Sequence, residues 1–157
     1  MTAERESEAM TPAQEVQFWM DRFDPKIQDL LRSVGTALRE RFPTANELAY
    51  DYTSHIVISY APADKGIDGI FGVAARHTGV FLYFNQGQNL PDPGKILQGK
   101  GKATRFIELQ SAGDMHRPEV EVLIRATLDQ AKIHFPQAGQ GRLIIKSSAA
   151  TKRPRKN

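Results

Sequence analysis

The stretch Leu48-Ala-Tyr-Asp-Tyr-Thr-Ser-His-Ile-Val-Ile-Ser-Tyr60 decides the fold class, because its apolar and aromatic side chains recur at every second position. A period of two is typical of a β-strand, in which successive side chains point to opposite faces. Two sets of side chains should each share one face of a strand: Leu48, Tyr50 and Tyr52 in the first, and Ile56, Ile58 and Tyr60 in the second. We therefore expect two consecutive strands here.

Three more strand candidates follow along the chain. Residues 70–75 and 80–84 are apolar runs joined by Arg76-His-Thr-Gly79, a spacing typical of a β-hairpin. A segment rich in glycine and proline follows, and residues 104–109 then predict a fifth strand. Because no helical pattern separates these runs, neighbouring strands should pair in opposite directions.

Helical patterns flank the strands on both sides. Thr11-Pro-Ala-Gln14 can form a capping box with proline at the first helical position, and Asp24-Pro25 repeats the start signal. Apolar residues then recur at helical spacing to Phe42, and again from Pro118 to Phe135. This order predicts an α+β domain, an antiparallel sheet of about five strands with the N-terminal and C-terminal helices packed on it.

The two ends of the chain differ from its middle. Residues 1–10 are polar and are expected to be disordered, whereas residues 11–141 should form the single domain that 157 residues suit. Residues 142–157 are expected to form a basic tail, although Leu143-Ile-Ile145 could add a short strand or pack against the domain. The six basic residues from Arg142 onward, with no acidic residue among them, account for the net charge of +3. The basic pI therefore belongs to the tail.

Composition excludes several classes of protein. The chain has no cysteine, which removes disulfides, thiolate zinc sites, iron–sulfur clusters and cysteine nucleophiles. No apolar run approaches the roughly 18 residues that a membrane span needs. Its N-terminus is acidic and has no apolar stretch, unlike a secretory signal. We expect a cytoplasmic protein with no membrane partner.

Three segments in the second half of the chain carry a family resemblance. They are Tyr83-Phe-Asn-Gln-Gly-Gln-Asn-Leu-Pro-Asp-Pro-Gly94, Leu97-Gln-Gly-Lys-Gly-Lys-Ala-Thr-Arg-Phe106 and Leu109-Gln-Ser-Ala-Gly-Asp114. With the helical pattern after them, they resemble the YdhG-like family, a set of small, mostly uncharacterised bacterial domains. The similarity covers roughly residues 17–133. It implies helices on one face of an antiparallel sheet and supplies no catalytic residues.

One branch of that family is described as frataxin-like iron chaperones, so the resemblance implies iron delivery as an alternative function. Such proteins hold iron weakly on acidic helix surfaces. The first expected helices do carry acidic residues, but basic residues interrupt them, so that no single acidic ridge forms. The acidic set is Glu15, Asp21, Asp24, Asp29, Glu40 and Glu47, and the basic set is Arg22, Lys26, Arg32, Arg39 and Arg41.

The loop before the fifth strand candidate combines glycines with cations. Residues 94–101 match Gly-x-x-x-x-Gly-Lys, but Gly101 stands where a phosphate-binding P-loop has the Ser or Thr that holds Mg²⁺. Lys95, Lys102 and Arg105 remain candidates for binding an anion, since glycine turns can point several N–H groups at one acceptor. The alternative is a surface turn whose lysines only keep it soluble.

The tyrosines offer a second candidate surface. Tyr52 and Tyr83 come from different strands and, with a third tyrosine, they would wall a shallow pocket if they shared one sheet face. Ordinary sheet packing is the alternative. Together with the cationic loop they suggest a non-enzymatic domain that binds a small ligand or a protein partner.

Catalytic and metal motifs are not evident. The four histidines show no zinc-binding spacing, and the nucleophile motif Gly-x-Ser-x-Gly is missing. We predict no cofactor and no resident metal. The tail segment Lys152-Arg-Pro-Arg-Lys156 favours a weak, salt-sensitive association with nucleic acid as a further alternative, although it has no aromatic residue to stack on bases.

Overall fold

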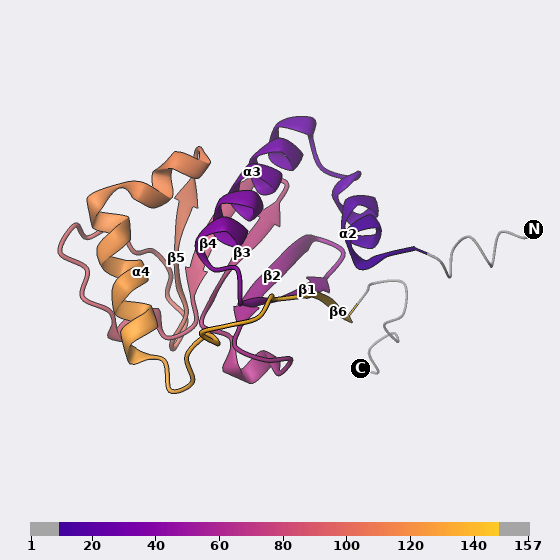
Figure 1. The fold of residues 1–157 in the computed structure, drawn as a ribbon. Helices are drawn as coiled ribbons and strands as arrows, with labels where there is room; N and C mark the ends of the chain where they lie inside the picture. The colour runs from indigo at the N-terminus through magenta and orange to yellow at the C-terminus, as the bar shows by residue number, and fades with distance from the viewer. Residues whose placement is uncertain (1–9, 148–157) are drawn as a thin grey trace, which may run out of the picture.

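A six-stranded sheet carrying helices on one face organises residues 10–147, which are the residues that the computed structural model describes (Figure 1). Its strands are β1 (Asn46–Asp51), β2 (His55–Ala61), β3 (Phe71–Arg76), β4 (Gly79–Phe84), β5 (Arg105–Leu109) and β6 (Leu143–Ser147). They lie in the order β5-β4-β3-β2-β1-β6. From β1 to β5 each strand pairs antiparallel with the next, as the sequence pattern predicts.

The prediction of about five antiparallel strands is wrong in one respect, because the sheet has a sixth strand, β6. It pairs with β1 in the parallel direction, so the sheet is mixed and has six strands. The chain reaches this edge through two hydrogen bonds, from the Gly141 amide to the Pro43 carbonyl (2.8 Å) and from the Arg142 amide to Oδ1 of Asn46 (2.9 Å). Residues 142–157 were expected to form the tail, and the short strand considered for residues 143–145 is present and extends to Ser147. The rest of that tail and nearly all of the expected disordered N-terminus lie outside the described residues.

Three α-helices form the second layer: α2 (Pro12–Met20), α3 (Pro25–Arg41) and α4 (Pro118–Gln130). Each has proline in its first turn, where the missing N–H costs nothing. The predicted capping box of α2 is confirmed, because the Thr11 hydroxyl accepts from the Gln14 amide and the Gln14 side chain accepts from the Thr11 amide. None of the helices in residues 10–147 has both the length and the apolar character that crossing a membrane requires.

Helix α4 ends earlier than its periodicity predicts. The apolar spacing continues to Phe135, but the helix ends at Gln130 and Ala131 is already extended. Phe135 instead packs its ring 5.6 Å from that of Phe42 and 6.0 Å from that of Phe71. Phe135 therefore packs in an aromatic cluster with Phe42 and Phe71, in the segment that connects α4 to β6.

The hydrophobic core lies between the helices and one face of the sheet. Strand register places Ile58, Val73, Leu82 and Ile107 in one row on this face, and all four are buried. Val34 of α3 is fully buried above them. The opposite face, which we call the open face, is covered by no α-helix among the described elements (Figure 1).

Candidate functional site

Tyr52 and Tyr83 both lie on the open face, together with Tyr50. The rings of Tyr50 and Tyr52 are stacked with centroids 5.9 Å apart, and Tyr52 stacks on His55 at 5.1 Å. Tyr83 lies across Gly72, with its hydroxyl near Ser59. Burial raises the pKa of the Tyr83 phenol, although its hydrogen bond with Ser59 opposes that shift. Three tyrosines thus share a face, but Tyr83 is packed down on the sheet.

The fourth tyrosine belongs to the other face. Tyr60 aligns with Glu47 on β1, and its hydroxyl donates a hydrogen bond of 2.8 Å to Oε2 of that carboxylate. Burial and the neighbouring Glu47 charge raise the pKa of the Tyr60 phenol well above its usual range. Tyr60 therefore remains a neutral hydrogen-bond donor inside the core.

The cationic candidates lie around the long loop between β4 and β5. Lys95 and Lys102 are both exposed, and Lys95 has a positive φ of 54° in a turn that the Asp92 carboxylate caps through the amides of Ile96 and Leu97. Arg105 donates to the carbonyls of Gly101 (2.6 Å) and Thr104 (2.9 Å). Its guanidinium is thus engaged in holding the loop's own backbone.

The tyrosines and Arg105 do not form one surface. In the register of β4 and β5, Tyr83 aligns with Phe106, whereas Arg105 aligns with Phe84, whose side chain is fully buried in the core. Because successive side chains alternate between faces, Arg105 leaves the sheet on the helix side and Tyr83 on the open side. The structure brings Tyr52 near Tyr83 and separates both from Arg105.

A cleft of about 600 Å³ lies elsewhere, at the meeting of three segments. One is the loop around η1 (Gly66–Asp68), the second runs from the end of β4 into η2 (Gly87–Asn89), and the third is the C-terminal end of α4. Two hydrogen bonds tie them together: Asn85 donates to the Gly69 carbonyl (2.5 Å), and Gln130 donates to the Gln86 carbonyl (3.2 Å). The cleft is therefore fixed by side chains that also line it.

Hydrogen-bonding groups dominate the polar part of this cleft. Its lining includes the side chains of Asn85, Gln86, Asn89, Gln130 and Thr127. Thr127 is only 2% exposed, but its hydroxyl is not sealed from solvent without a partner, because Oγ of Ser147 is the only such side-chain atom among residues 10–147. A hydroxyl that solvent reaches can exchange water for a bound molecule.

The rim of the cleft combines one charge of each sign with exposed apolar surface. Asp68 and Lys132 both line it, so its charged groups are balanced. Ile67 is 90% exposed and Ile133 is 52% exposed, which is unusual for side chains of this size. Since both isoleucines line the cleft, they can contact the apolar part of a ligand.

The residues that line the cleft carry no catalytic or metal motif, which is why the sequence-based search did not select them. A weak signal was present, because Asn85-Gln-Gly-Gln-Asn89 places four carboxamides directly after a strand. No signal in the sequence indicates that Thr127, some 40 residues later, reaches the same place.

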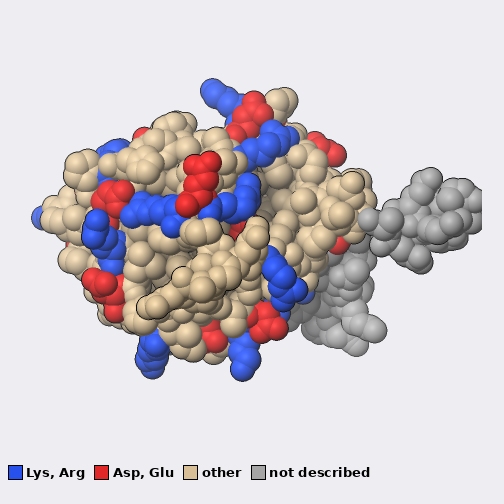
Figure 2. All heavy atoms as spheres, viewed as in Figure 1, with Lys and Arg blue, Asp and Glu red and all other residues tan. Residues whose placement is uncertain are grey.

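Charges of both signs are interspersed over the face shown in Figure 2. Several are paired, Arg32 with Asp29 within α3 and Arg41 of α3 with Glu121 of α4. Among the described residues there is no group of three or more His, Asp or Glu side chains placed to hold a metal ion. Iron delivery stays a prediction: saturable micromolar binding in an Fe²⁺ titration would support it, and none would contradict it.

Comparison of the chain with family models, with curated proteins and with solved structures finds no match.

Proposed function

We propose that this protein is a non-catalytic binding domain whose ligand is a small polar organic molecule held in the cleft of η1, β4–η2 and α4. The observation that carries the proposal is the lining itself, because Thr127 and four residues with carboxamide side chains meet at one cleft of about 600 Å³. Small-molecule sites typically have volumes of roughly 300–1,000 Å³ and a few convergent polar groups.

The lining defines the class of ligand. Carboxamides both donate and accept hydrogen bonds, so they match a molecule that carries several groups of each kind. Asp68 and Lys132 balance each other, which disfavours a ligand with a large net charge of either sign. Ile67 and Ile133 add an apolar contact at the rim. A neutral or zwitterionic metabolite such as an amino acid, a nucleoside or a sugar fits this description.

Ligand-observed NMR with separate amino acid, nucleoside and sugar mixtures tests the proposal. Thr127→Val removes the hydroxyl while it keeps the shape of the side chain, and Asn89→Ala removes a carboxamide. Each should weaken binding about 5-fold or more, since a lost hydrogen bond of a buried group is worth roughly 1–3 kcal/mol. Val122→Ala, an exposed position on the same helix outside the cleft, is the matched control. Binding that both cleft variants retain would contradict the proposal.

A second candidate function, association with single-stranded nucleic acid, has one observation in its favour. The sequence of the tail has cations without aromatic residues, but the last described residue before them lies beside aromatic side chains. Ser147, the last described residue, aligns with Tyr50 in the register of β6 and β1, and Tyr50 begins the Tyr50–Tyr52–His55 stack. Bases stack on such aromatic side chains, while cations pair with phosphates.

Fluorescence anisotropy with labelled oligo-dT tests this second candidate. Tyr52→Ala should weaken binding at every salt concentration, whereas removal of residues 148–157 should mainly flatten its salt dependence. If neither Tyr52→Ala nor removal of residues 148–157 changes oligo-dT binding, the open face and the tail are excluded as the binding surface.

A further inference from the structure

A second, smaller pocket lies between α2, α3 and the helix-covered face of the sheet, remote from the cleft. Its volume is about 200 Å³. Its apolar lining comes from both helices and from three strands: Val16, Met20, Leu31, Ile58, Val73 and Leu143. One carboxylate interrupts this lining, that of Glu47 on β1, whose residue is 6% exposed.

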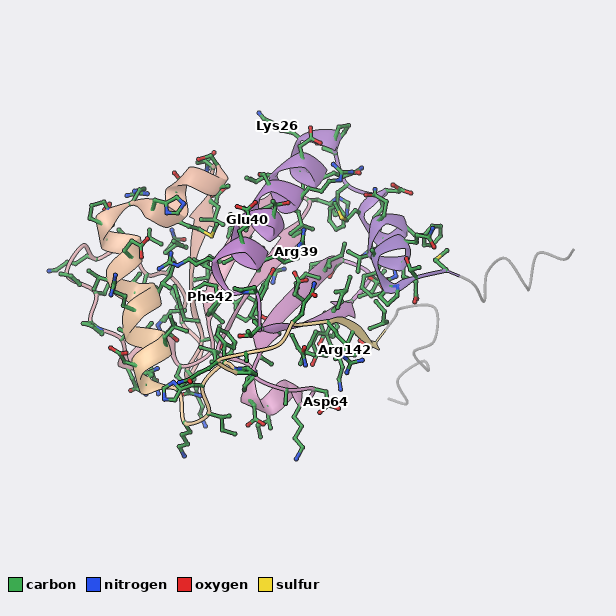
Figure 3. All side chains as sticks on the ribbon, in the orientation of Figure 1. Lys26, Arg39, Glu40, Phe42, Asp64 and Arg142 are labelled. Carbon is green, nitrogen blue, oxygen red and sulfur yellow. The ribbon has the colours of Figure 1, made fainter. Side chains whose placement is uncertain are left out.

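The two oxygens of Glu47 have different surroundings. Oε2 accepts hydrogen bonds from the Tyr60 hydroxyl (2.8 Å) and from Arg39 (3.1 Å). Oε1 accepts none from residues 10–147. Arg39 extends from α3 toward the strands, whereas Lys26 on the same helix points away from the molecule (Figure 3). Oε1 is not sealed from solvent, because Oγ of Ser147 is the only side-chain polar atom among the described residues that is buried without a partner. A ligand donor in the pocket can therefore replace water at Oε1.

The charges around the pocket decide which donor it can take. Arg39 already pairs with Glu47, and Arg32 also lines the pocket. A ligand ammonium would add a third positive charge beside these two guanidinium groups. A ligand carboxylate would face Glu47 itself. An uncharged donor such as a hydroxyl can bond to Oε1 without either repulsion.

We propose that this pocket is a binding site for a small, uncharged, mainly apolar molecule that carries one hydroxyl group. The hydroxyl donates to Oε1 of Glu47, and the apolar body contacts Met20, Leu31 and Val73. An apolar cavity of about 150 Å³ is large enough to hold benzene, so this pocket can hold a ring with a short substituent. Its polar end reaches solvent beside Arg39, whose side chain is 55% exposed.

Four benzene derivatives of similar size test the proposal on the full chain: benzyl alcohol, toluene, benzylamine and benzoate. In ¹⁵N–¹H spectra, benzyl alcohol should shift amides of α2, α3, β1 and β2. It should bind about tenfold or more tightly than toluene, because a hydrogen bond to a charged group adds to the apolar contact. Benzylamine and benzoate should bind more weakly than benzyl alcohol.

Two variants separate a ligand site from a site that takes only water. Val16→Trp fills the pocket from the surface helix and should abolish the shifts. Glu47→Gln should reduce the preference for benzyl alcohol over toluene at least threefold. Thr127→Val, in the remote cleft, should change nothing. The proposal would be overturned if toluene bound as tightly as benzyl alcohol, or if benzylamine or benzoate bound most tightly of the four. It would also be overturned if no probe shifted the amides of α2, α3, β1 and β2.

Discussion

The Tyr60 hydroxyl on β2 donates a hydrogen bond of 2.8 Å to Glu47 on β1, and both residues lie beneath α3 in the core. Tyr60 is 1% exposed and Glu47 is 6% exposed. Oε2 of the same carboxylate also accepts a hydrogen bond of 3.1 Å from Arg39 on α3. The contact therefore links the first two strands to the helix layer with polar groups.

Removal of the Tyr60 hydroxyl should lower the stability of the protein. Tyr60→Phe leaves the buried Glu47 carboxylate with one donor fewer, so we expect the free energy of unfolding to fall by about 1–3 kcal/mol. Urea unfolding measures this change. Tyr50→Phe is the matched control on the half-exposed open face and should change stability by less than about 0.5 kcal/mol. Equal effects of the two substitutions would contradict this role for Tyr60.

The contact between Tyr83 and Gly72 predicts a steric effect. A Cβ at Gly72 would overlap the Tyr83 side chain and would lie 2.7 Å from the Ile58 carbonyl oxygen, which is backbone and cannot easily move. Gly72→Ala should destabilise the protein by about 1–3 kcal/mol. At Gly101 the nearest atom would be 3.9 Å away, so Gly101→Ala should have little effect in the same thermal or urea unfolding assay. If Gly72→Ala left the stability unchanged, Tyr83 could not be packed against Gly72 as described.

The ion pair between Arg41 and Glu121 predicts a pH dependence. Hydrogen bonds from Arg41, with a smaller contribution from His116, hold the pKa of the Glu121 carboxyl below its ordinary value of 4.5. A carboxyl with a lowered pKa binds its proton less readily in the folded state than in the unfolded chain. Its contribution to stability is therefore present above pH 4.5 and is lost as the pH falls through the folded-state pKa.

Urea unfolding of the natural chain and of Glu121→Gln at several pH values measures this effect. The stability difference between them should be largest near pH 7 and should shrink below pH 4.5. A difference that stays constant or grows on acidification would show that the ion pair does not lower this pKa.

Strand β6 predicts protection from hydrogen exchange. If residues 143–147 pair with β1, their hydrogen-bonded amides should exchange much more slowly than those of the exposed turn at residues 99–102. Exchange monitored by NMR resolves these residues individually. Equally rapid exchange in both segments would mean that the chain after Arg142 is not part of the sheet.

The fold was largely predictable because its first five strands are specified locally. Alternation from Leu48 to Tyr60 and the turn at Arg76–Gly79 define strands that pair with their sequence neighbours. The apolar run at residues 143–145 suggested a possible short strand, but nothing local specified its pairing, because its partner β1 lies almost 100 residues earlier and the pairing is parallel. Short apolar runs such as residues 143–145 acquire a partner only through the tertiary fold.

The candidate site was less predictable than the fold. Lys95, Lys102 and Arg105 were selected for their charge, but Arg105 binds carbonyls of its own loop. The cleft instead collects uncharged amides and a threonine, which have no motif of their own. Alternation predicted that Tyr50 and Tyr52 share a face of their strand, and the strand register adds Tyr83 to that face. The face on which Arg105 lies is set by its register with β4, where it aligns with the core residue Phe84 and not with Tyr83.

The central claim is that the cleft of η1, β4–η2 and α4 binds a small polar molecule. It is tested most directly by mapping ¹⁵N–¹H shifts on the full chain with the tightest-binding metabolite of the three mixtures. We predict saturable shifts confined to residues 67–70, 85–89 and 127–133, which Thr127→Val weakens and Val122→Ala does not. Shifts confined to the open face or to the loop at residues 94–105, or no saturable shift with any mixture, would contradict the claim.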